Sequence, residues 1–245
     1  STQNSGETAN VIAKHHLNTI CTSGLCPNRT ECWAARTATL MIGGNVCTRS
    51  CKFCNTLSGR PEKLNPAEPQ NVADSIKALG LRYAVITSVD RDDLKDYGAE
   101  HWVKTISCIK KENPDTILEV LIPDFMGNKQ LVEMVMKARP NVAGHNMETV
   151  RRLTPSVRSV ARYERSLDVL TAITQSGVMA KTGFMVGLGE TIEEVEELMD
   201  DILATGCRRL TIGQYLQPTS RHLPVAEYIT PEQFEKYRQT DLNKG

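Results

Sequence analysis

The sequence predicts an α/β protein, a partial parallel (β/α)6 barrel with an N-terminal cysteine-bearing extension. Short apolar runs alternate with amphipathic helical patterns along most of the 245 residues. Such alternation favours a parallel sheet with right-handed crossovers. A closed barrel of eight units typically needs ~250 residues, and eight units do not fit here. We therefore expect an extension over residues 1–36 and the partial barrel over residues 37–245.

The six predicted strands are continuous apolar runs, not runs in which polar and apolar residues alternate. Continuous runs are typical of strands with helices on one face and a core on the other. They fall at residues 38–42, 82–88, 116–121, 141–144, 180–186 and 209–213.

Helical patterns separate these runs. The clearest begins at Thr191, which has the spacing of a capping box with Glu194, continues as an apolar stripe and ends at Gly206. Weaker patterns cover residues 71–79, 99–112, 129–138 and 163–176.

Composition narrows the classes of function. The 29 basic and 29 acidic residues give no net charge, which argues against a nucleic-acid backbone as the main partner. No run approaches the ~18 apolar residues of a membrane span, and the first 20 residues lack the features of a secretory signal. We expect a cytoplasmic monomer, or one in an organellar matrix or stroma if a transit peptide was removed.

Six of the eight cysteines form two triplets. The triplets are Cys21-x4-Cys26-x5-Cys32 and Cys47-x3-Cys51-x2-Cys54. Each is one thiolate short of the four protein ligands that usually hold a 4Fe–4S cluster. The triplets therefore predict two clusters, each with one iron open to another ligand. A disulfide framework suits short secreted chains better. A zinc site that combines Cys32 with the second triplet is the alternative metal site.

The second triplet, with Phe53 before its last cysteine, resembles that of the radical S-adenosylmethionine superfamily. The resemblance implies that Cys47, Cys51 and Cys54 hold a 4Fe–4S cluster whose open iron binds S-adenosylmethionine. It also implies a partial or full (β/α) barrel, in agreement with the strand count.

The first triplet and motifs along the chain resemble those of the lipoyl synthases, over residues 18–238. The motifs include Thr87-Ser-Val-Asp-Arg-Asp-Asp93, Pro123-Asp-Phe125, His145-Asn-Met-Glu-Thr149, Gly213-Gln-Tyr-Leu-Gln-Pro-Thr219 and the segment from His222 to Pro231. The resemblance implies sulfur insertion at carbons 6 and 8 of a protein-bound octanoyl group.

The same resemblance implies the ligands and partners of that reaction. Cys21, Cys26 and Cys32 would hold an auxiliary cluster that donates sulfur, with the N-terminal segment over the barrel mouth. An octanoylated lipoyl carrier domain or protein would be the substrate, and a ferredoxin or flavodoxin the electron donor. The lipoyl synthases take a fourth auxiliary ligand from an Arg-Ser-Ser-Tyr motif, which residues 1–245 do not contain.

Further cofactor contacts are expected near the carboxyl ends of the strands, where α/β barrels build their active sites. Arg158 can pair bidentately with a carboxylate, Asn146 can bind a zwitterion without titrating, and Lys181 is unusual in an apolar strand. The full set of candidates is Phe53, Ser88, Asp90, Asn146, Glu148, Arg158, Lys181, Gln214, Tyr215 and Leu216. For several of them a structural or surface role is the alternative.

Two other functions fit the sequence less well. A biotin synthase-like radical sulfurtransferase lacks the first triplet, and an iron–sulfur electron carrier does not need a six-unit barrel. Gly187-Leu-Gly189 lacks the third glycine of a dinucleotide fingerprint, so nicotinamide cofactors are not expected.

Overall fold

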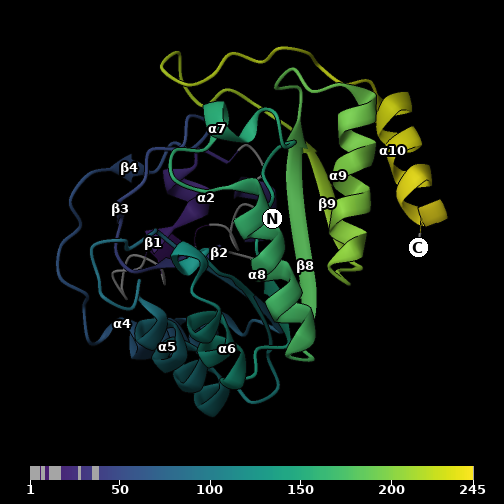
Figure 1. Ribbon diagram of the computed structural model, residues 1–245. Coiled ribbons are helices and arrows are strands. Elements are labelled where there is room, and N and C mark those ends of the chain that lie inside the picture. Colours follow the sequence, from purple (N-terminus) through teal and green to yellow (C-terminus); the bar gives the residue numbers. More distant parts are fainter. Residues whose placement is uncertain (1–5, 7–8, 11–17, 27–28, 35–38, 245) are drawn as a thin grey trace.

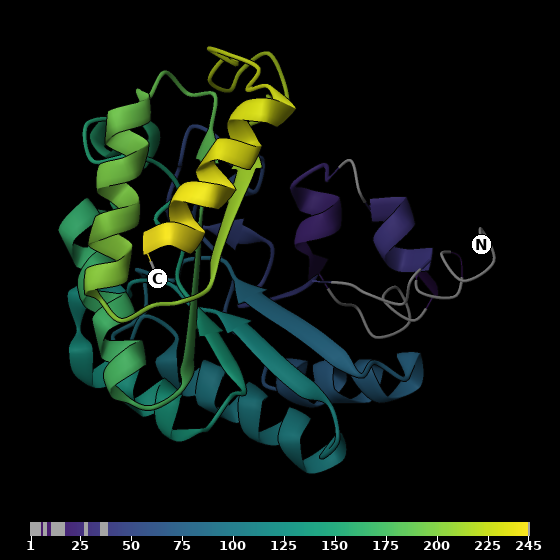
Figure 2. The same cartoon turned by 90° about the vertical axis from the view of Figure 1, so that its right-hand side faces the viewer.

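The computed structural model describes residues 6, 9–10, 18–26, 29–34 and 39–244. Its main sheet has the order β1-β2-β5-β6-β7-β8-β9 and curls into an open half-barrel (Figures 1 and 2). The six strands from β2 onward are parallel. Their bounds are β2 Thr39–Ile42, β5 Tyr83–Ser88, β6 Ile117–Leu121, β7 Val142–Gly144, β8 Met179–Val186 and β9 Leu210–Gln214.

A helix follows each parallel strand and covers the outer face of the sheet (Figure 1). These helices are α4 Glu68–Leu79, α5 Ala99–Glu112, α6 Lys129–Lys137, α8 Tyr163–Gln175, α9 Ile192–Ala204 and α10 Pro231–Lys244. The (β/α)6 prediction is therefore confirmed. The sequence patterns located every helix of the six except α10, which buries only Tyr237 and so carries little apolar pattern.

The remaining elements are short. The N-terminal part contains β1 Asn18–Thr19, which pairs antiparallel with β2, and the helices α2 Ile20–Ser23 and α3 Arg29–Ala34. Strands β3 Val46–Cys47 and β4 Leu57–Ser58 form a separate ladder. A 3-10 turn η1 Phe125–Gly127 and a helix α7 Thr154–Val157 complete the set. The predicted domain boundary at residues 36 and 37 lies outside the described residues.

Alternation along the strands divides the molecule into two faces. Leu40 and Ile42 of β2 are buried in the core under the helices. Thr39 and Met41 point to the concave face, where both line a cavity, because successive side chains of a strand point to opposite sides of the sheet. Apolar side chains packed between the outer face and the helices thus stabilise the fold, by about 1.5–3 kcal/mol for each large side chain that is fully buried. The concave face is left for the site.

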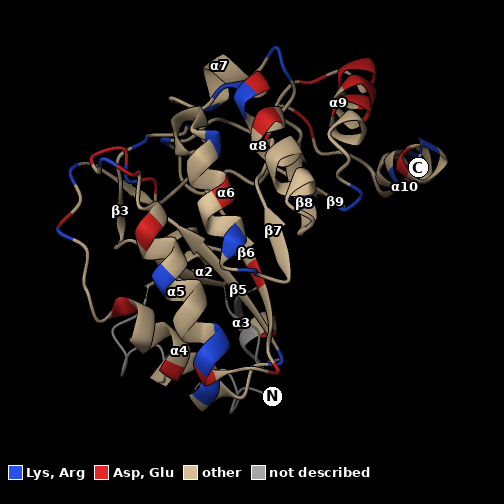
Figure 3. Ribbon diagram, turned by 60° about the horizontal axis from the view of Figure 1, so that its bottom comes forward, with Lys and Arg blue, Asp and Glu red and all other residues tan. Residues whose placement is uncertain are grey.

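The predicted capping box is present at the start of α9. The Glu194 amide donates to Thr191 Oγ1 at 3.3 Å, and the Thr191 amide donates to Glu194 Oε2 at 2.8 Å. Acidic side chains gather on α9 (Figure 3). They form ion pairs with Arg151 and Arg152, which lie on a loop that follows the carboxyl end of β7. This charged cluster lies on the outer surface and is separate from the concave face.

Within the described ranges, none of the helices has the combined length and apolar character that crossing a membrane requires. All eight cysteines are free thiols.

Candidate active site at the mouth of the half-barrel

A cavity of about 340 Å³ lies at the carboxyl ends of the strands. All three cysteines of the second triplet line it, together with Phe53, Ser88, Asp90, Asn146, Glu148 and Arg158. The fold therefore brings six of the ten predicted cofactor contacts to one place. A larger cavity of about 610 Å³ lies at the opposite ends of β7 and β8 and contains none of the cysteines.

The loop that carries the second triplet is held against two other segments. The amides of Arg49 and Asp90 point at Cys47 Sγ, at 3.4 and 3.3 Å. Ser159 Oγ lies 3.8 Å from Cys51 Sγ and accepts a hydrogen bond from the Ser50 amide at 3.1 Å. Cys47 is thus placed by the end of β5, and Cys51 by the segment after α7.

Burial disfavours the thiolate form in this loop. Burial, with the Asp90 carboxylate as a second cause, raises the pKa of Cys47 to about 12. Burial also raises the pKa of Cys51. A bound cation reverses this preference because coordination deprotonates the thiol. Three thiols around one cavity are therefore a donor set that fits an iron–sulfur cluster.

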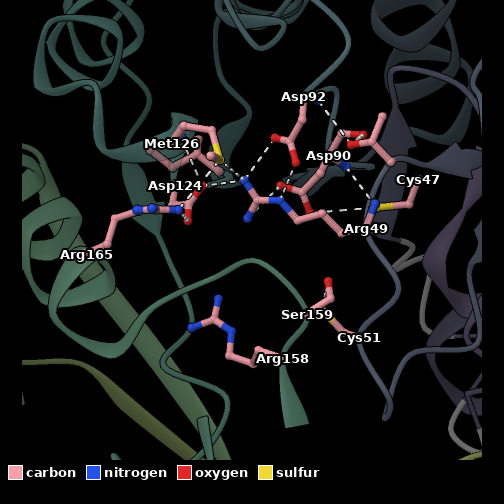
Figure 4. Close-up of polar contacts among 12 residues, drawn as sticks. Cys47, Arg49, Cys51, Asp90, Asp92, Asp124, Met126, Arg158, Ser159 and Arg165 are labelled. Carbon is pink, nitrogen blue, oxygen red and sulfur yellow. Dashed lines mark hydrogen bonds and ion pairs between the residues drawn. The ribbon is translucent and has the colours of Figure 1, made fainter. Parts of the chain in front are cut away.

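Arg49 connects the cysteine loop to the ends of β5 and β6 (Figure 4). Its guanidinium is 3.4 Å from Asp90, 2.7 Å from Asp92 and 2.6 Å from Asp124, and its side chain is only 3% exposed. Arg165 from α8 also contacts Asp124, at 3.2 Å. Although burial opposes ionisation, the hydrogen bond from Arg49 holds the pKa of Asp124 below its usual range. Burial raises the pKa of Asp90 to about 6.

Arg158 has an unused hydrogen-bond donor at the cavity. Its Nη1 donates to Ser166 Oγ at 2.8 Å and to Met147 O at 3.3 Å, but its buried Nε has no partner among the residues that the structure describes. Burial of an unpaired donor is costly, and a carboxylate ligand would satisfy it. Glu148, also at the cavity, has φ +65°, and burial raises its pKa. These features fit the amino-acid end of S-adenosylmethionine.

His145 is linked to Arg158 through the hydroxyl group of Ser166. Its Nδ1 is 2.9 Å from Ile122 O, which can only accept, so Nδ1 carries the hydrogen. Its Nε2 therefore accepts from Ser166 Oγ, at 2.9 Å. Burial, followed by the charge of Arg158, lowers the pKa of His145 to about 4.

This lowered pKa predicts an acid-sensitive fold. Between pH 6.5 and 4, His145 binds a proton in the unfolded chain but stays neutral in the folded protein. The free energy of unfolding therefore falls as the pH falls through this window. Between pH 7 and 4.5, we expect the free energy of unfolding of a His145→Gln variant to fall by about 2 kcal/mol less than that of the parent. Urea unfolding of the metal-free proteins at both pH values measures this difference. Equal losses in the two proteins would contradict it.

Cys21 of the first triplet lies next to a residue that lines this cavity. Cys21 is buried on α2, and Ile20 next to it lines the cavity. Asn55 Nδ2 of the cysteine loop donates to Ser23 O at 2.9 Å. Burial raises the pKa of Cys32, and the charges of Cys21 and Cys26 raise it further. Cys32 therefore lies within electrostatic range of the other two thiols of this triplet.

No three His, Cys, Asp or Glu side chains within the described segments are arranged to hold a single metal ion. The zinc site through Cys32 is thus not formed there. A four-iron cluster does not require its ligands to converge on one metal ion, since each thiolate binds a separate iron.

Four predicted contacts are not brought to the cavity. Lys181 Nζ pairs with Glu119 Oε1 at 2.8 Å on the concave face. Gln214 and Tyr215 bind the backbone of the segment that follows β9. Leu216 is 49% exposed.

Sequence reasoning missed Arg49, Asp124, Ser159 and His222, which all contact the cysteine loop or its anchors. The position of Arg49 inside the triplet was the only local signal for it. Asp124 lies in a motif that the resemblance included without a role.

Known proteins match this fold and site. The model of the radical SAM superfamily matches residues 41–202. The solved structure of methylornithine synthase is similar with a TM-score of 0.64 at 14% identity, covering 83% of this chain and 62% of that one. The solved structure of the hydrogenase maturase HydG is similar with a TM-score of 0.66 at 14% identity, covering 96% of this chain and 61% of that one. At such identities the structures show the fold alone, but the sequence match shows that the chain belongs to the radical SAM superfamily. Membership implies a 4Fe–4S cluster and S-adenosylmethionine.

Closer relatives define the family. The chain is 64% identical over 240 residues to the lipoyl synthase of Porphyromonas gingivalis, covering 98% of this chain and 85% of that protein. The identity is 62% over 239 residues to the lipoyl synthase of Phocaeicola vulgatus, covering 98% and 84%. Within the superfamily, the chain belongs to the lipoyl synthase family of enzymes.

Proposed function

We propose that this chain inserts two sulfur atoms into a protein-bound octanoyl group, at carbons 6 and 8. One observation carries the proposal beyond family membership. Ile20, the neighbour of Cys21 in the first triplet, lines the same cavity as the second triplet. Sulfur transfer to a carbon radical requires the sulfur source and the radical source to meet at one substrate chain, which this arrangement supports.

Different residues of the cavity would have different roles in this reaction. Cys47, Cys51 and Cys54 would hold the cluster that, with S-adenosylmethionine bound, supplies a radical able to remove hydrogen from unactivated carbon. Arg158 offers its free Nε–H to the carboxylate of that cofactor. Met41 and Leu121 give the concave wall an apolar surface against which an acyl chain can displace water.

The first triplet has the second role in this proposal. Cys21, Cys26 and Cys32 would hold an auxiliary 4Fe–4S cluster, the source of the inserted sulfur. The charges of Cys21 and Cys26 raise the pKa of Cys32, which supports a shared site. The remaining participants would be an octanoylated lipoyl carrier domain and a ferredoxin or flavodoxin as reductant, and the enzyme would be monomeric and cytoplasmic.

An anaerobic assay tests the proposal. The protein is reconstituted with iron and sulfide, reduced, and given S-adenosylmethionine with an octanoyl-lysyl peptide. We expect 5′-deoxyadenosine and a peptide that has gained two sulfur atoms. In protein that also carries the Arg-Ser-Ser-Tyr motif of the family, formation of 5′-deoxyadenosine without a thiolated peptide would refute sulfur insertion. Absence of 5′-deoxyadenosine would refute radical catalysis altogether.

A further inference from the structure

The segment after β9 bridges the open side of the half-barrel. The sheet begins with β1 and β2 and ends with β9, so its first and last strands do not pair. Residues 215–230, here called the strap, run across the top of the molecule (Figure 1). In the strap, Leu223 donates its amide hydrogen to Lys52 O at 3.2 Å. The strap therefore joins the last strand to the cysteine loop that follows the first parallel strand.

The strap is itself anchored at several points. Gln214 Nε2 at the end of β9 donates to Glu227 O at 3.1 Å, and the Ala226 amide donates to Gly187 O at 2.8 Å. Gly187 has φ +95°, and a Cβ there would lie 2.4 Å from Glu227 O. Only a glycine allows this close approach of the strap to the end of β8. The strap is thus held at both of its sides.

His222 forms the link from the strap to the third cysteine. Its Nε2 lies 3.1 Å from Cys54 O, and its Nδ1 lies 2.9 Å from Thr219 Oγ1. A carbonyl oxygen only accepts, so Nε2 carries the hydrogen and Nδ1 accepts from the Thr219 hydroxyl. Both ring nitrogens are paired, which fixes the orientation of the ring.

The three cysteines of the loop are therefore placed by three different parts of the chain. Cys47 is placed by the end of β5 and Cys51 by the segment after α7, as described above. Cys54 receives its contact from the strap. A cluster held by three thiolates needs all three at fixed positions, so loosening one of them weakens the hold of the whole set.

We propose that His222 is a positioning residue for the radical cluster, and that retention of the cluster depends on the strap. The superfamily match ends at residue 202, so the strap lies beyond the region by which the chain matches the superfamily. The proposal rests on the superfamily's cluster and does not require sulfur insertion.

The test measures how fast the cluster is lost to an iron chelator. The parent is a Cys21→Ala/Cys26→Ala/Cys32→Ala variant, in which only the second triplet remains to hold a cluster. After anaerobic reconstitution, a ferrous chelator is added and the visible absorbance of the cluster is followed. We expect His222→Ala to lose its cluster roughly three- to tenfold faster than the parent, as for the loss of one hydrogen bond.

Two further variants separate positioning from folding. His222→Gln keeps an N–H donor and is expected to stay within about twofold of the parent. Arg221→Ala, an exposed neighbour on the strap, is the matched control and should lose its cluster at the parent rate.

Two results would overturn the proposal. One is an unchanged rate in His222→Ala. The other is an equal acceleration in the Ala and Gln variants together with an equal fall in the thermal unfolding midpoint of the metal-free proteins. No octanoyl substrate takes part, so a failure of the proposed reaction would leave this assay readable.

Discussion

Replacement of Arg49 by methionine is expected to lower the free energy of unfolding of the metal-free protein by about 3–5 kcal/mol. Arg49 is nearly fully buried and faces Asp90, Asp92 and Asp124. Its removal leaves buried Asp124 and half-buried Asp90 and Asp92 without their main counter-charge, and Arg165 reaches only Asp124. Breaking a buried charge network from one side is costly because the remaining charges are already desolvated.

Arg151 offers a matched control for this prediction. It also faces three carboxylates, those of Glu164, Glu197 and Asp201, but its side chain is 45% exposed. Exposed ion pairs contribute little, so Arg151→Met should cost less than about 1 kcal/mol. Urea unfolding of both variants measures the contrast. Equal costs in the two would show that burial does not set the contribution of Arg49.

The same Arg49 variant should also retain less iron in the second triplet. Arg49 lies between Cys47 and Cys51 and ties the loop to the ends of two strands. Iron analysis after reconstitution under conditions where the variant is still folded tests this consequence. Full iron content would mean that the other contacts of the loop suffice.

Substitution of Cys51 by alanine is expected to abolish formation of 5′-deoxyadenosine, whereas substitution of Cys26 should leave some of it and abolish sulfur insertion. Cys51 lines the cavity with Cys47 and Cys54, and loss of one of three thiolates removes the site for the radical cluster. Cys26 belongs to the triplet assigned to sulfur donation, which the cleavage of S-adenosylmethionine does not consume.

Product analysis of the two variants by mass spectrometry measures both outcomes in one reaction. Cys108→Ala is the control, because Cys108 packs against the core and is remote from both triplets in the sequence. It should form both products at the parent level. An equal loss of 5′-deoxyadenosine in the Cys51 and Cys26 variants would contradict the division of labour between the triplets.

Local patterns made most of the barrel predictable. Continuous apolar runs located all six parallel strands, because such runs are typical of a parallel sheet that helices cover. The capping box and apolar stripe located α9 with its start at Thr191. Helix α10 was missed because it buries a single residue, so its sequence carries little of the periodicity on which the prediction depends.

Long-range contacts explain what the sequence did not reveal about the site. Arg49 meets Asp92 and Asp124 across 43 and 75 residues, and His222 meets Cys54 across 168. No spacing rule connects such pairs. Conversely, Gln214 and Tyr215 lie at the end of a strand as a cofactor contact would, but their side chains bind backbone carbonyls of residues 227 and 223.

By itself, the sequence determined the order of strands and helices, the two cysteine triplets and the chemistry that these triplets imply, since periodicity and ligand spacing act between near neighbours. Only the tertiary structure decided which polar residues reach the cavity and which elements fix each cysteine. These depend on the curl of the sheet and on the strap across its opening, where the free energy of burial and the pairing of buried charges select partners from distant parts of the chain.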